Sequence, residues 1–429
     1  MNQPHQIIAL MGPYGFGNLG DAAIQSAMIA AIRRRLPKAE IVGISLNPAD
    51  TAARHGIPSY SIGHMANQGW ELQGRIGKYL HRLQMRLYSH PSGWLRRLAR
   101  LLLAPPIELL GTLQSYVCMK DWTAVFASGG GQLDDDWGGP WHHPYTMWLW
   151  GRLCRASRVK YRFVSVGAGP LNARQSERFA CGALASADYR SFRDERSRQF
   201  MAQRGFFRDD PVYPDLAHSL PVAAYLSSPR REYPSPQFSG RIVGLGPMAY
   251  YDPRVWPYKD QAVYMDYLRK LAEFSAWLVE RGYRIVLFPG EAAHDRDVIQ
   301  DFLKLAADFR LRPAEDLCAP QVETVDDLMH ALAGVDLVVA SRFHGVLLPM
   351  LLDKPMLATS YHPKVDELMK DTDQADYCLP IDSFTVSQLQ DGFTRMEANQ
   401  DVIRQQIRSR IEEYRQALEE QYDRIFNDL

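Results

Sequence analysis

Length, composition and charge exclude several classes of protein. A chain of 429 residues with 46% hydrophobic and 23% charged residues is too long for one ordinary core and too apolar to be disordered, so we expect two domains. Its 49 basic residues balance 49 acidic residues, which excludes a global field that attracts nucleic acid, so any anion site must be local.

Neither a metal-binding cysteine pattern nor a membrane signal is evident. The five cysteines are scattered without a CxxC pair, which favours buried thiols in a reducing compartment. The N-terminal residues lack the basic and apolar regions of a signal peptide, and no stretch reaches the roughly 20 apolar residues that cross a bilayer. We therefore expect a cytoplasmic protein without a metal or resident cofactor.

The first half alternates strand and helix patterns. An apolar run at 6–11 is followed by GPYGFGNLGD and by helical periodicity through Leu36. Further strands are predicted at 40–45, 123–127 and 160–166, separated by helical stretches. This order predicts a parallel sheet wound with helices in an N-terminal Rossmann-like domain at 1–220.

A basic helical insertion at about 70–115 interrupts this domain. Between Leu72 and Ile107 there is no acidic residue, and basic residues alternate with aliphatic and aromatic ones. The basic residues are Arg75, Lys78, Arg82, Arg86, Arg96, Arg97 and Arg100. Such a segment either lies on an anionic membrane, here the inner face of the cytoplasmic membrane, or packs on the domain as a helical pair.

The second half repeats the pattern. A linker rich in Pro and Ser is expected at 221–240, and a C-terminal Rossmann-like domain at 241–384. Its predicted strands are 241–246, 283–290, 336–341 and 355–360, and its predicted helices include 261–281 and 296–308. A charged helical segment at 385–429 carries one apolar stripe, typical of a solvated helix with one packed face.

The strongest local signal is the pentapeptide SRFHG directly after the strand at 336–341. Ser341 is a natural helix N-cap, and a helix N-terminus attracts anions. Arg342 offers a planar donor fork for phosphate or carboxylate, and His344 titrates near neutrality and can transfer protons. The alternative is a helix start whose arginine pairs with a surface carboxylate.

Two glycine-rich turns also follow predicted strands. In the first, Gly17 permits close approach of a ligand, while Asn18 and Asp21 could bind sugar hydroxyls, or Asp21 could cap the helix. This loop is neither a P-loop nor a dinucleotide fingerprint. The second turn is Gly129-Gly130-Gly131, at a strand end where open α/β sheets bind ligands.

Charged residues near other strand ends are weaker candidates. The acidic run 134–136 is interpreted as a solvated loop rather than a metal site. Arg193 could provide a second cationic clamp, whereas Asp194 and Asp215 are caps or catalytic groups. The run HDRD at 294–297 also lies beyond a strand end.

Taken in order, these segments resemble the polysaccharide pyruvyl transferase family. The matching segments are GFGNLGD (15–21), GGG (129–131), SFRDERS (191–197), PDLA (214–217) and DLVVASRFHGVLLPMLLDKPMLATSYHPKV (336–365). The resemblance implies two Rossmann-like domains facing across a cleft, as in GT-B glycosyltransferases. It also implies pyruvyl transfer from phosphoenolpyruvate to a saccharide without a metal. Arg342 and His344 match the family's Arg-x-His motif, and Arg193 matches its RD motif.

The sequence departs from the family pattern in places and leaves rival functions open. Ala22 stands where many relatives have an acid, and Pro349 interrupts the helix after SRFHG. Lys364 and Asp21 are further candidates, for carboxylate binding and acceptor activation. The saccharide acceptor, lipid-linked or polymeric, belongs to exopolysaccharide or cell-surface glycan synthesis. The alternatives are a GT-B glycosyltransferase using a nucleotide sugar and a non-catalytic binder of lipid-linked glycan.

Overall fold

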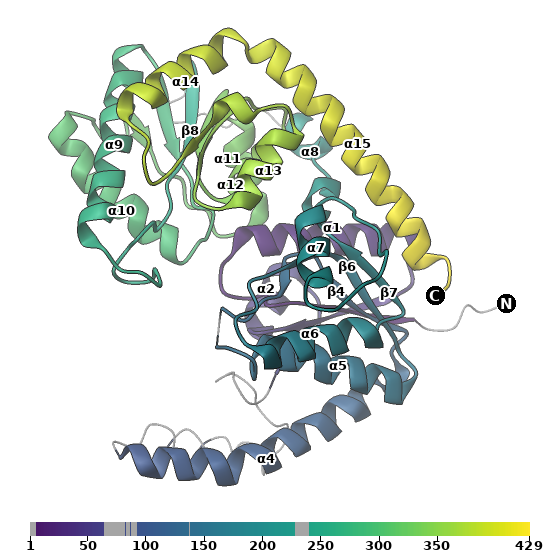
Figure 1. Cartoon of the computed structure of the whole chain (residues 1–429). Helices are drawn as coiled ribbons and strands as arrows, with labels where there is room; N and C mark the ends of the chain where they lie inside the picture. Colours follow the sequence, from purple (N-terminus) through teal and green to yellow (C-terminus); the bar gives the residue numbers. More distant parts are fainter. Residues whose placement is uncertain (1–5, 64–81, 83–85, 87–91, 137, 228–239) are drawn as a thin grey trace. The chain divides into compact units, whose positions relative to one another are not determined.

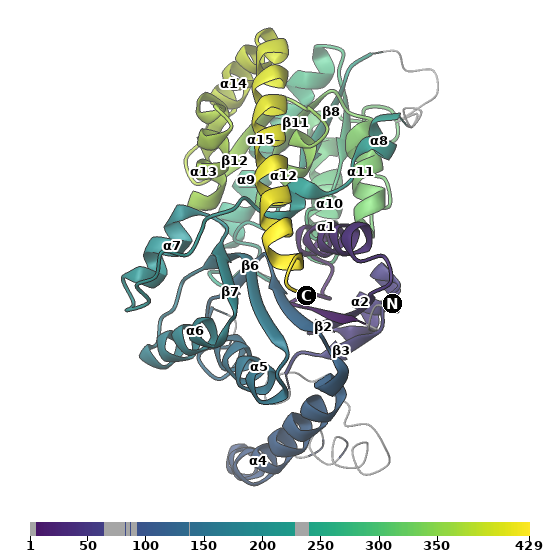
Figure 2. The same ribbon diagram turned by 90° about the vertical axis from the view of Figure 1, so that its right-hand side faces the viewer.

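The computed structural model describes residues 6–63, 82, 86, 92–136, 138–227 and 240–429. Backbone contacts divide the chain into two units, coloured by sequence in Figures 1 and 2. Unit 1 comprises the residues up to Phe16, Ile24–Leu216 and Leu418–Leu429; unit 2 comprises Gly17–Ala23 and Ala217–Ala417. The expected linker at 221–240 falls mostly outside the described residues.

Unit 1 is built on a parallel sheet in the order β3-β2-β1-β4-β6-β5, with β7 also paired to β6. The strands are β1 (Ile7–Met11), β2 (Glu40–Ser45), β3 (Ser59–Ser61), β4 (Ala124–Ser128), β5 (Gly131–Leu133), β6 (Lys160–Ala168) and β7 (Tyr189–Phe192). The helices are α1 (Leu19–Arg35), which begins in unit 2, α2 (Pro48–His55), α4 (Gly93–Cys118), α5 (His143–Ser157), α6 (Arg174–Ser186) and α7 (Glu195–Ala202). The central strands are almost continuously buried, as expected for a sheet covered on both faces.

Unit 2 contains a parallel sheet in the order β10-β9-β8-β11-β12-β13. The strands are β8 (Ile242–Gly246), β9 (Arg284–Leu287), β10 (Leu317–Cys318), β11 (Leu337–Ala340), β12 (Met356–Ser360) and β13 (Cys378–Pro380). The helices are α8 (Ala223–Ser227), α9 (Gln261–Glu280), α10 (His294–Ala306), α11 (Val325–Ala333), α12 (Phe343–Met350), α13 (Pro363–Asp371) and α14 (Val386–Ala398). Within the unit this is the Rossmann strand order, and it reverses between β8 and β11, where such sheets bind ligands.

The C-terminal segment forms α14 and then α15 (Gln400–Phe426), which contributes to both units. Its predicted apolar stripe is confirmed, because the aliphatic members of the stripe are all buried: Ile407, Ile411, Leu418 and Ile425. In unit 1 the buried Arg162 donates to the carbonyl oxygen of Ile425 and to the carboxylate of Asp428 at 2.5 Å. The last turns of the chain are therefore part of the first unit's core.

The predicted basic insertion lies largely outside the described residues. Its later part is α4, a single helix that contains Pro105 and Pro106. Among the described residues, no helix is both long enough and apolar enough to span a membrane.

The prediction that the acidic loop at 134–136 is solvated is wrong for its middle residue, Asp135. Asp135 is buried, and its carboxylate accepts hydrogen bonds from the backbone N–H groups of Asn172 and Ala173 and from the Ser176 hydroxyl. Burial alone would raise the pKa of Asp135, but these hydrogen bonds from Ser176 and Asn172 lower it below its ordinary value. The loop is thus fixed to the start of α6 by one carboxylate.

We expect the substitution Asp135→Asn to lower the free energy of unfolding by about 1–3 kcal/mol at neutral pH, because buried donors lose a charged acceptor. The folded-state pKa is depressed, so this contribution is present above about pH 4 and is lost as the pH falls below it. Urea unfolding from pH 3 to 7 measures it, with the neighbouring exposed Asp136→Asn as control. Equal effects of both variants would contradict this account.

Candidate functional site

The turn between β11 and α12 lies beside the reversal point of the second sheet. Ala340, the last residue of β11, is in register with Gly246 at the end of β8 and with Ala358 of β12. The predicted motif follows at once, with Arg342 in extended backbone conformation immediately before the first turn of α12. Residues 341–344 are therefore held at the carboxyl edge of the sheet.

Ser341 does not cap α12, contrary to the sequence-based prediction. The residue at the N-cap position is Arg342, and the buried Ser341 hydroxyl is hydrogen-bonded to the Tyr267 hydroxyl at 3.0 Å and to Thr359 at 2.6 Å. Burial raises the pKa of Tyr267 to about 12, so this phenol stays protonated. Ser341 therefore ties β11 to α9 and β12 beneath the turn.

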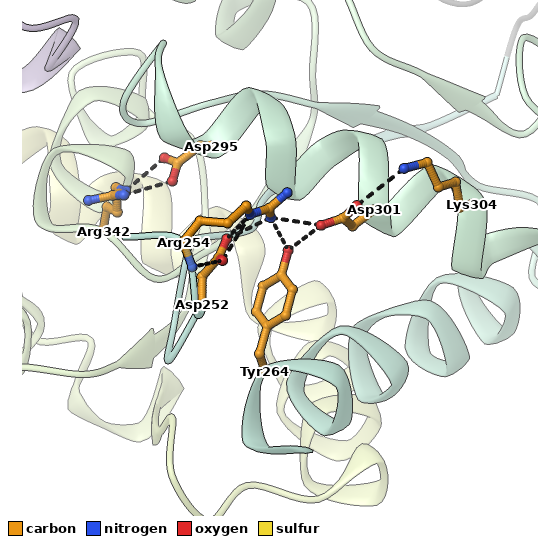
Figure 3. Close-up of polar contacts among 7 residues, drawn as sticks. All are labelled: Asp252, Arg254, Tyr264, Asp295, Asp301, Lys304 and Arg342. Carbon is orange, nitrogen blue, oxygen red and sulfur yellow. Dashed lines mark hydrogen bonds and ion pairs between the residues drawn. The ribbon is translucent and has the colours of Figure 1, made fainter. Parts of the chain in front are cut away.

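Arg342 is held by two carboxylates, Glu291 on the β9–α10 loop and Asp295 at the start of α10, and Figure 3 shows the pair with Asp295. Its Nε and Nη2 donate to the two oxygens of Asp295, both at 2.7 Å, and Nη2 lies 3.0 Å from the carboxylate of Glu291. Burial alone would lower the pKa of Arg342, but Asp295 and Glu291 outweigh it and raise that pKa above its ordinary value. The guanidinium is permanently charged and fixed in orientation.

Asp295 is the organising residue beneath Arg342. It is fully buried, and besides Arg342 it accepts hydrogen bonds from the backbone N–H groups of Gly290 and Glu291. A side chain at Gly290 would collide with Arg342, since a Cβ there would lie 2.6 Å from its Cδ. The alternative prediction, that Arg342 pairs with a surface carboxylate, is thus wrong about the carboxylate's location.

A second arginine is held by the same helix in a separate network (Figure 3). Arg254 donates to Asp252 at 2.6 and 2.9 Å and to Asp301 of α10 at 2.7 Å. The Tyr264 hydroxyl is bonded to both Arg254 and Asp301. Asp295 and Asp301 thus place two guanidinium groups along α10, and Arg254 offers an internal comparison for Arg342.

The first glycine loop packs on the Arg342 loop within unit 2. The backbone N–H of Ala292 donates to the Gly17 carbonyl at 2.7 Å, and Asn18 forms a bridge with Glu291. The Asn18 side chain accepts from the N–H groups of Gly20 and Asp21, so Asn18 caps α1 and the predicted capping alternative for Asp21 is wrong. Asp21 lies half-buried in the first turn of the helix.

His344 lies directly against this loop. A Cβ at Gly20 would be only 1.9 Å from its Nδ1, so the imidazole occupies the space that any side chain at Gly20 would need. The ring also makes an edge contact with Phe343, at 5.1 Å between centroids. The absence of a side chain at Gly20 therefore sets the position of the imidazole.

Lys364 lies near the same turn. Its ammonium nitrogen is 5.9 Å from the ring centroid of Phe343 and 5.7 Å from that of Tyr361. Tyr361 in turn contacts Trp256, at 6.0 Å between ring centroids. The structure thus gathers Arg342, His344 and Lys364 with the loop at 17–20 in unit 2.

The remaining predicted residues form a separate group in unit 1. Gly129 and Gly130, both buried, follow β4, and Gly131 begins β5. Arg193 lies beside them, because its side chain and the Gly130 carbonyl both border Gly167. A Cβ at Gly167 would lie 2.9 Å from Nη2 of Arg193 and 3.1 Å from the Gly130 carbonyl oxygen. This grouping places one arginine next to the glycine turn of the first sheet.

Two aspartates hold Arg193 in that position. Its Nε lies 3.3 Å from Asp194 and its Nη1 lies 3.5 Å from Asp215. Burial alone would lower the pKa of Arg193, but the two carboxylates raise it above its ordinary value. Asp194 also accepts from the Ser197 N–H and caps α7. Of the two roles predicted for these aspartates, capping by Asp194 is confirmed.

The sequence comparisons identify the family. A family model described as polysaccharide pyruvyl transferase matches residues 18–363, which is most of the chain. The chain belongs to the polysaccharide pyruvyl transferase family. The match includes residues 18–21 at the end of the first glycine turn, the second glycine turn, Arg193 and the turn with Arg342 and His344. A comparison with curated protein sequences gave no match.

Solved structures similar to this pyruvyl transferase family member share its fold at low sequence identity. A glycosyltransferase from Rickettsia africae ESF-5 is 9% identical, with a TM-score of 0.57 over 99% of this chain and 100% of its own. HepE from Anabaena, solved in complex with UDP, is 12% identical, with a TM-score of 0.55 over the same shares. A UDP-N-acetylglucosamine 2-epimerase described as putative, from Listeria monocytogenes, is 11% identical, with a TM-score of 0.56 over 94% and 91%. These similarities confirm a GT-B-like pair of Rossmann-like domains.

The candidate site contains residues that sequence analysis did not single out. Asp295 was part of a weak candidate run, and Glu291 and Gly290 were not considered. The available signal was the run FPGE followed by HDRD, directly after a predicted strand of the same sheet as β11. Among the described residues, no group of three or more His, Cys, Asp and Glu side chains is arranged to hold a metal ion.

We expect the substitution Gly20→Ala to lower pyruvyl transfer by roughly 10²-fold, because the added methyl group must displace His344 or the first turn of α1. The matched control is Gly345→Ala, since a Cβ there would lie at an ordinary 3.6 Å from Ala340. Initial rates and thermal unfolding of both variants measure the effect. A loss of activity in the control equal to that in Gly20→Ala would contradict the steric argument.

Proposed function

We propose that this chain transfers the pyruvyl group of phosphoenolpyruvate to two hydroxyl groups of a saccharide, forming a pyruvate ketal in exopolysaccharide or cell-surface glycan synthesis. Family membership supports pyruvyl transfer to a polysaccharide. The observation that carries the choice of donor is the half-buried, carboxylate-fixed Arg342 beside His344 at the reversal point of a Rossmann sheet. A fixed guanidinium suits the planar recognition of phosphate or carboxylate, and phosphoenolpyruvate carries both.

The chemistry defines what the residues must do. A proton is added to C3 of the enol, one sugar hydroxyl forms a bond to C2, and a second hydroxyl forms the other C2–O bond as the C2–O bond to phosphate breaks. Of the two hydroxyl protons released, one balances the proton taken up at C3 and the other leaves with phosphate. The cationic carbon at C2 lies between two anionic groups, so the protein must fix those groups and deliver one proton.

We assign the roles as follows. Arg342 binds the phosphate through Nη1, since Nε and Nη2 contact Asp295 and Glu291, and His344 transfers the proton. Lys364 binds the carboxylate. The loop with Gly17, Asn18 and Asp21 contacts the acceptor, with Asp21 accepting a hydroxyl proton.

Arg193 and the turn at 129–131 form a further substrate contact in unit 1. Arg193 keeps a permanent positive charge between Asp194 and Asp215, and the glycines let a ligand approach the backbone. Both features suit an anionic or hydroxylated ligand. In this proposal phosphoenolpyruvate is a co-substrate, and no resident cofactor takes part.

The test is incubation of the purified protein with phosphoenolpyruvate and a panel of polymeric and lipid-linked saccharides. Phosphate release that depends on the saccharide, together with the mass increase of one pyruvate ketal, is the expected result. Transfer of sugar from a nucleotide sugar, without ketal formation, would instead support a glycosyltransferase. Saccharide binding without phosphate release would indicate a non-catalytic glycan binder.

A further inference from the structure

Helix α4 presents an apolar face to solvent. Trp94, Leu102, Leu109, Leu110, Leu113 and Val117 are all exposed, most by 52% to 67% of their maximum. Four of them are spaced by seven, four and four residues, so they share one side of the helix. The opposite side faces unit 1, where Gly111 is buried and Glu108 is hydrogen-bonded to Tyr145 of α5. The apolar side is therefore the outward side of α4.

A patch of this kind is unusual for a monomeric surface. Exposed aliphatic residues occur singly on most proteins, whereas a continuous stripe with a tryptophan marks an interaction surface. At about 1.5 Å per residue, Leu102 to Val117 covers roughly 22 Å of helix. Figures 1 and 2 both show the first turns of α4 apart from the sheet of unit 1.

The charge of the sequence that leads into α4 indicates which kind of partner its apolar side binds. From Leu72 to Ile107 the chain carries seven basic residues and no acidic residue, and the described Arg82 is exposed. A second copy of the chain on this face would bring two copies of α4 together, each with Arg96, Arg97 and Arg100 near its start, which like-charge repulsion opposes. A nucleic acid would satisfy the arginines but leave the leucines and Trp94 in water. An anionic bilayer accepts both, because its headgroups attract the cations and its acyl region takes the apolar side chains.

We propose that α4 is a membrane-docking helix that lies in the plane of an anionic bilayer, with Leu102, Leu109, Leu113 and Val117 inserted at the boundary of the headgroups and acyl chains. The proposal is independent of the transferase chemistry, because it uses none of the residues to which that chemistry is assigned. It makes the protein a peripheral membrane protein. An acceptor attached to a lipid would then be concentrated in the same plane.

The test is co-sedimentation of the full-length protein with vesicles. At about 0.1 M salt, most of the protein should pellet with vesicles containing phosphatidylglycerol, and little with pure phosphatidylcholine vesicles. The double variant Leu109→Asp/Leu113→Asp should reduce pelleting at least tenfold, since two charges would have to enter the interface. The matched control is Phe207→Asp, which places a charge at another exposed apolar residue of unit 1 and should leave pelleting unchanged.

Three results would overturn the proposal. One is equal pelleting with neutral vesicles, which would remove the role of the basic residues. Another is unchanged pelleting by the double variant while its thermal unfolding matches that of the wild type. The third is self-association, detected by sedimentation velocity without lipid and abolished by the same double variant, because that result would assign the face to a second copy of the chain.

Discussion

Replacement of Arg342 by alanine is expected to lower pyruvyl transfer by roughly 10²-fold or more. The guanidinium is the fixed cation of the site, held by Asp295 through two hydrogen bonds of 2.7 Å. The same change leaves the fully buried Asp295 carboxylate unpaired, so the free energy of unfolding should also fall, by about 3–5 kcal/mol. Initial rates with phosphoenolpyruvate and chemical unfolding measure the two effects separately.

Two further variants separate catalysis from stability. The double variant Arg342→Ala/Asp295→Ala removes the unpaired carboxylate and should recover part of the stability without recovering activity. Arg254→Ala disrupts a comparable network, which consists of a bidentate pair with Asp252 and a hydrogen bond to Asp301 of α10 (Figure 3), and should retain activity. If Arg342→Ala/Asp295→Ala regains activity together with stability, Arg342 does not bind the substrate.

The variant His344→Ala is expected to lower kcat by roughly 10²-fold or more, because it removes the group to which we assign the proton transfer. The effect on affinity for phosphoenolpyruvate should be smaller than that of Arg342→Ala, since the imidazole acts mainly in the chemical step. Steady-state kinetics combined with calorimetric titration of phosphoenolpyruvate distinguishes the two contributions.

His330→Ala is the matched control for His344→Ala. His330 lies in the same unit, on α11, where its ring nitrogen is 3.6 Å from the Asp326 carboxylate and its ring contacts Tyr225 at 5.1 Å between centroids. Its replacement should leave kcat within twofold of the wild type. A His344→Ala variant that keeps its kcat and loses only affinity would show that the imidazole binds phosphate rather than transferring a proton.

The sheets could be predicted from sequence because their strands are buried runs ended by glycine or small residues. The runs at 40–45 and 241–246 became β2 and β8 almost residue for residue. The short edge strands β3, β10 and β13 were not foreseen, since two or three residues carry no periodicity. The assignment of residues 17–23 and 418–429 could not be read from the sequence, because each segment belongs to a different unit from the residues directly before it in the chain.

The candidate site was predictable where a motif carries chemistry and unpredictable where it depends on packing. Arg342 and His344 were identified because a guanidinium and an imidazole follow a buried strand. The role of Asp295 was missed because Asp295 and Arg342 are 47 residues apart in sequence and follow two strands, β9 and β11, that lie on either side of β8 in the sheet. The cap assigned to Ser341 was wrong for a related reason: Thr359 and Tyr267 offer its hydroxyl buried partners that no local pattern reveals.

The membership of Gly17–Ala23 in the second unit limits how this protein can be recombined with its relatives. The chain passes between the units four times, after Phe16, Ala23, Leu216 and Ala417. A chimera joined only near residue 217 would combine the Arg342 loop of one parent with the Gly17–Gly20 backbone of the other. Exchange of acceptor preference between family members should therefore succeed only when this short N-terminal segment is transferred together with the C-terminal unit that it contacts.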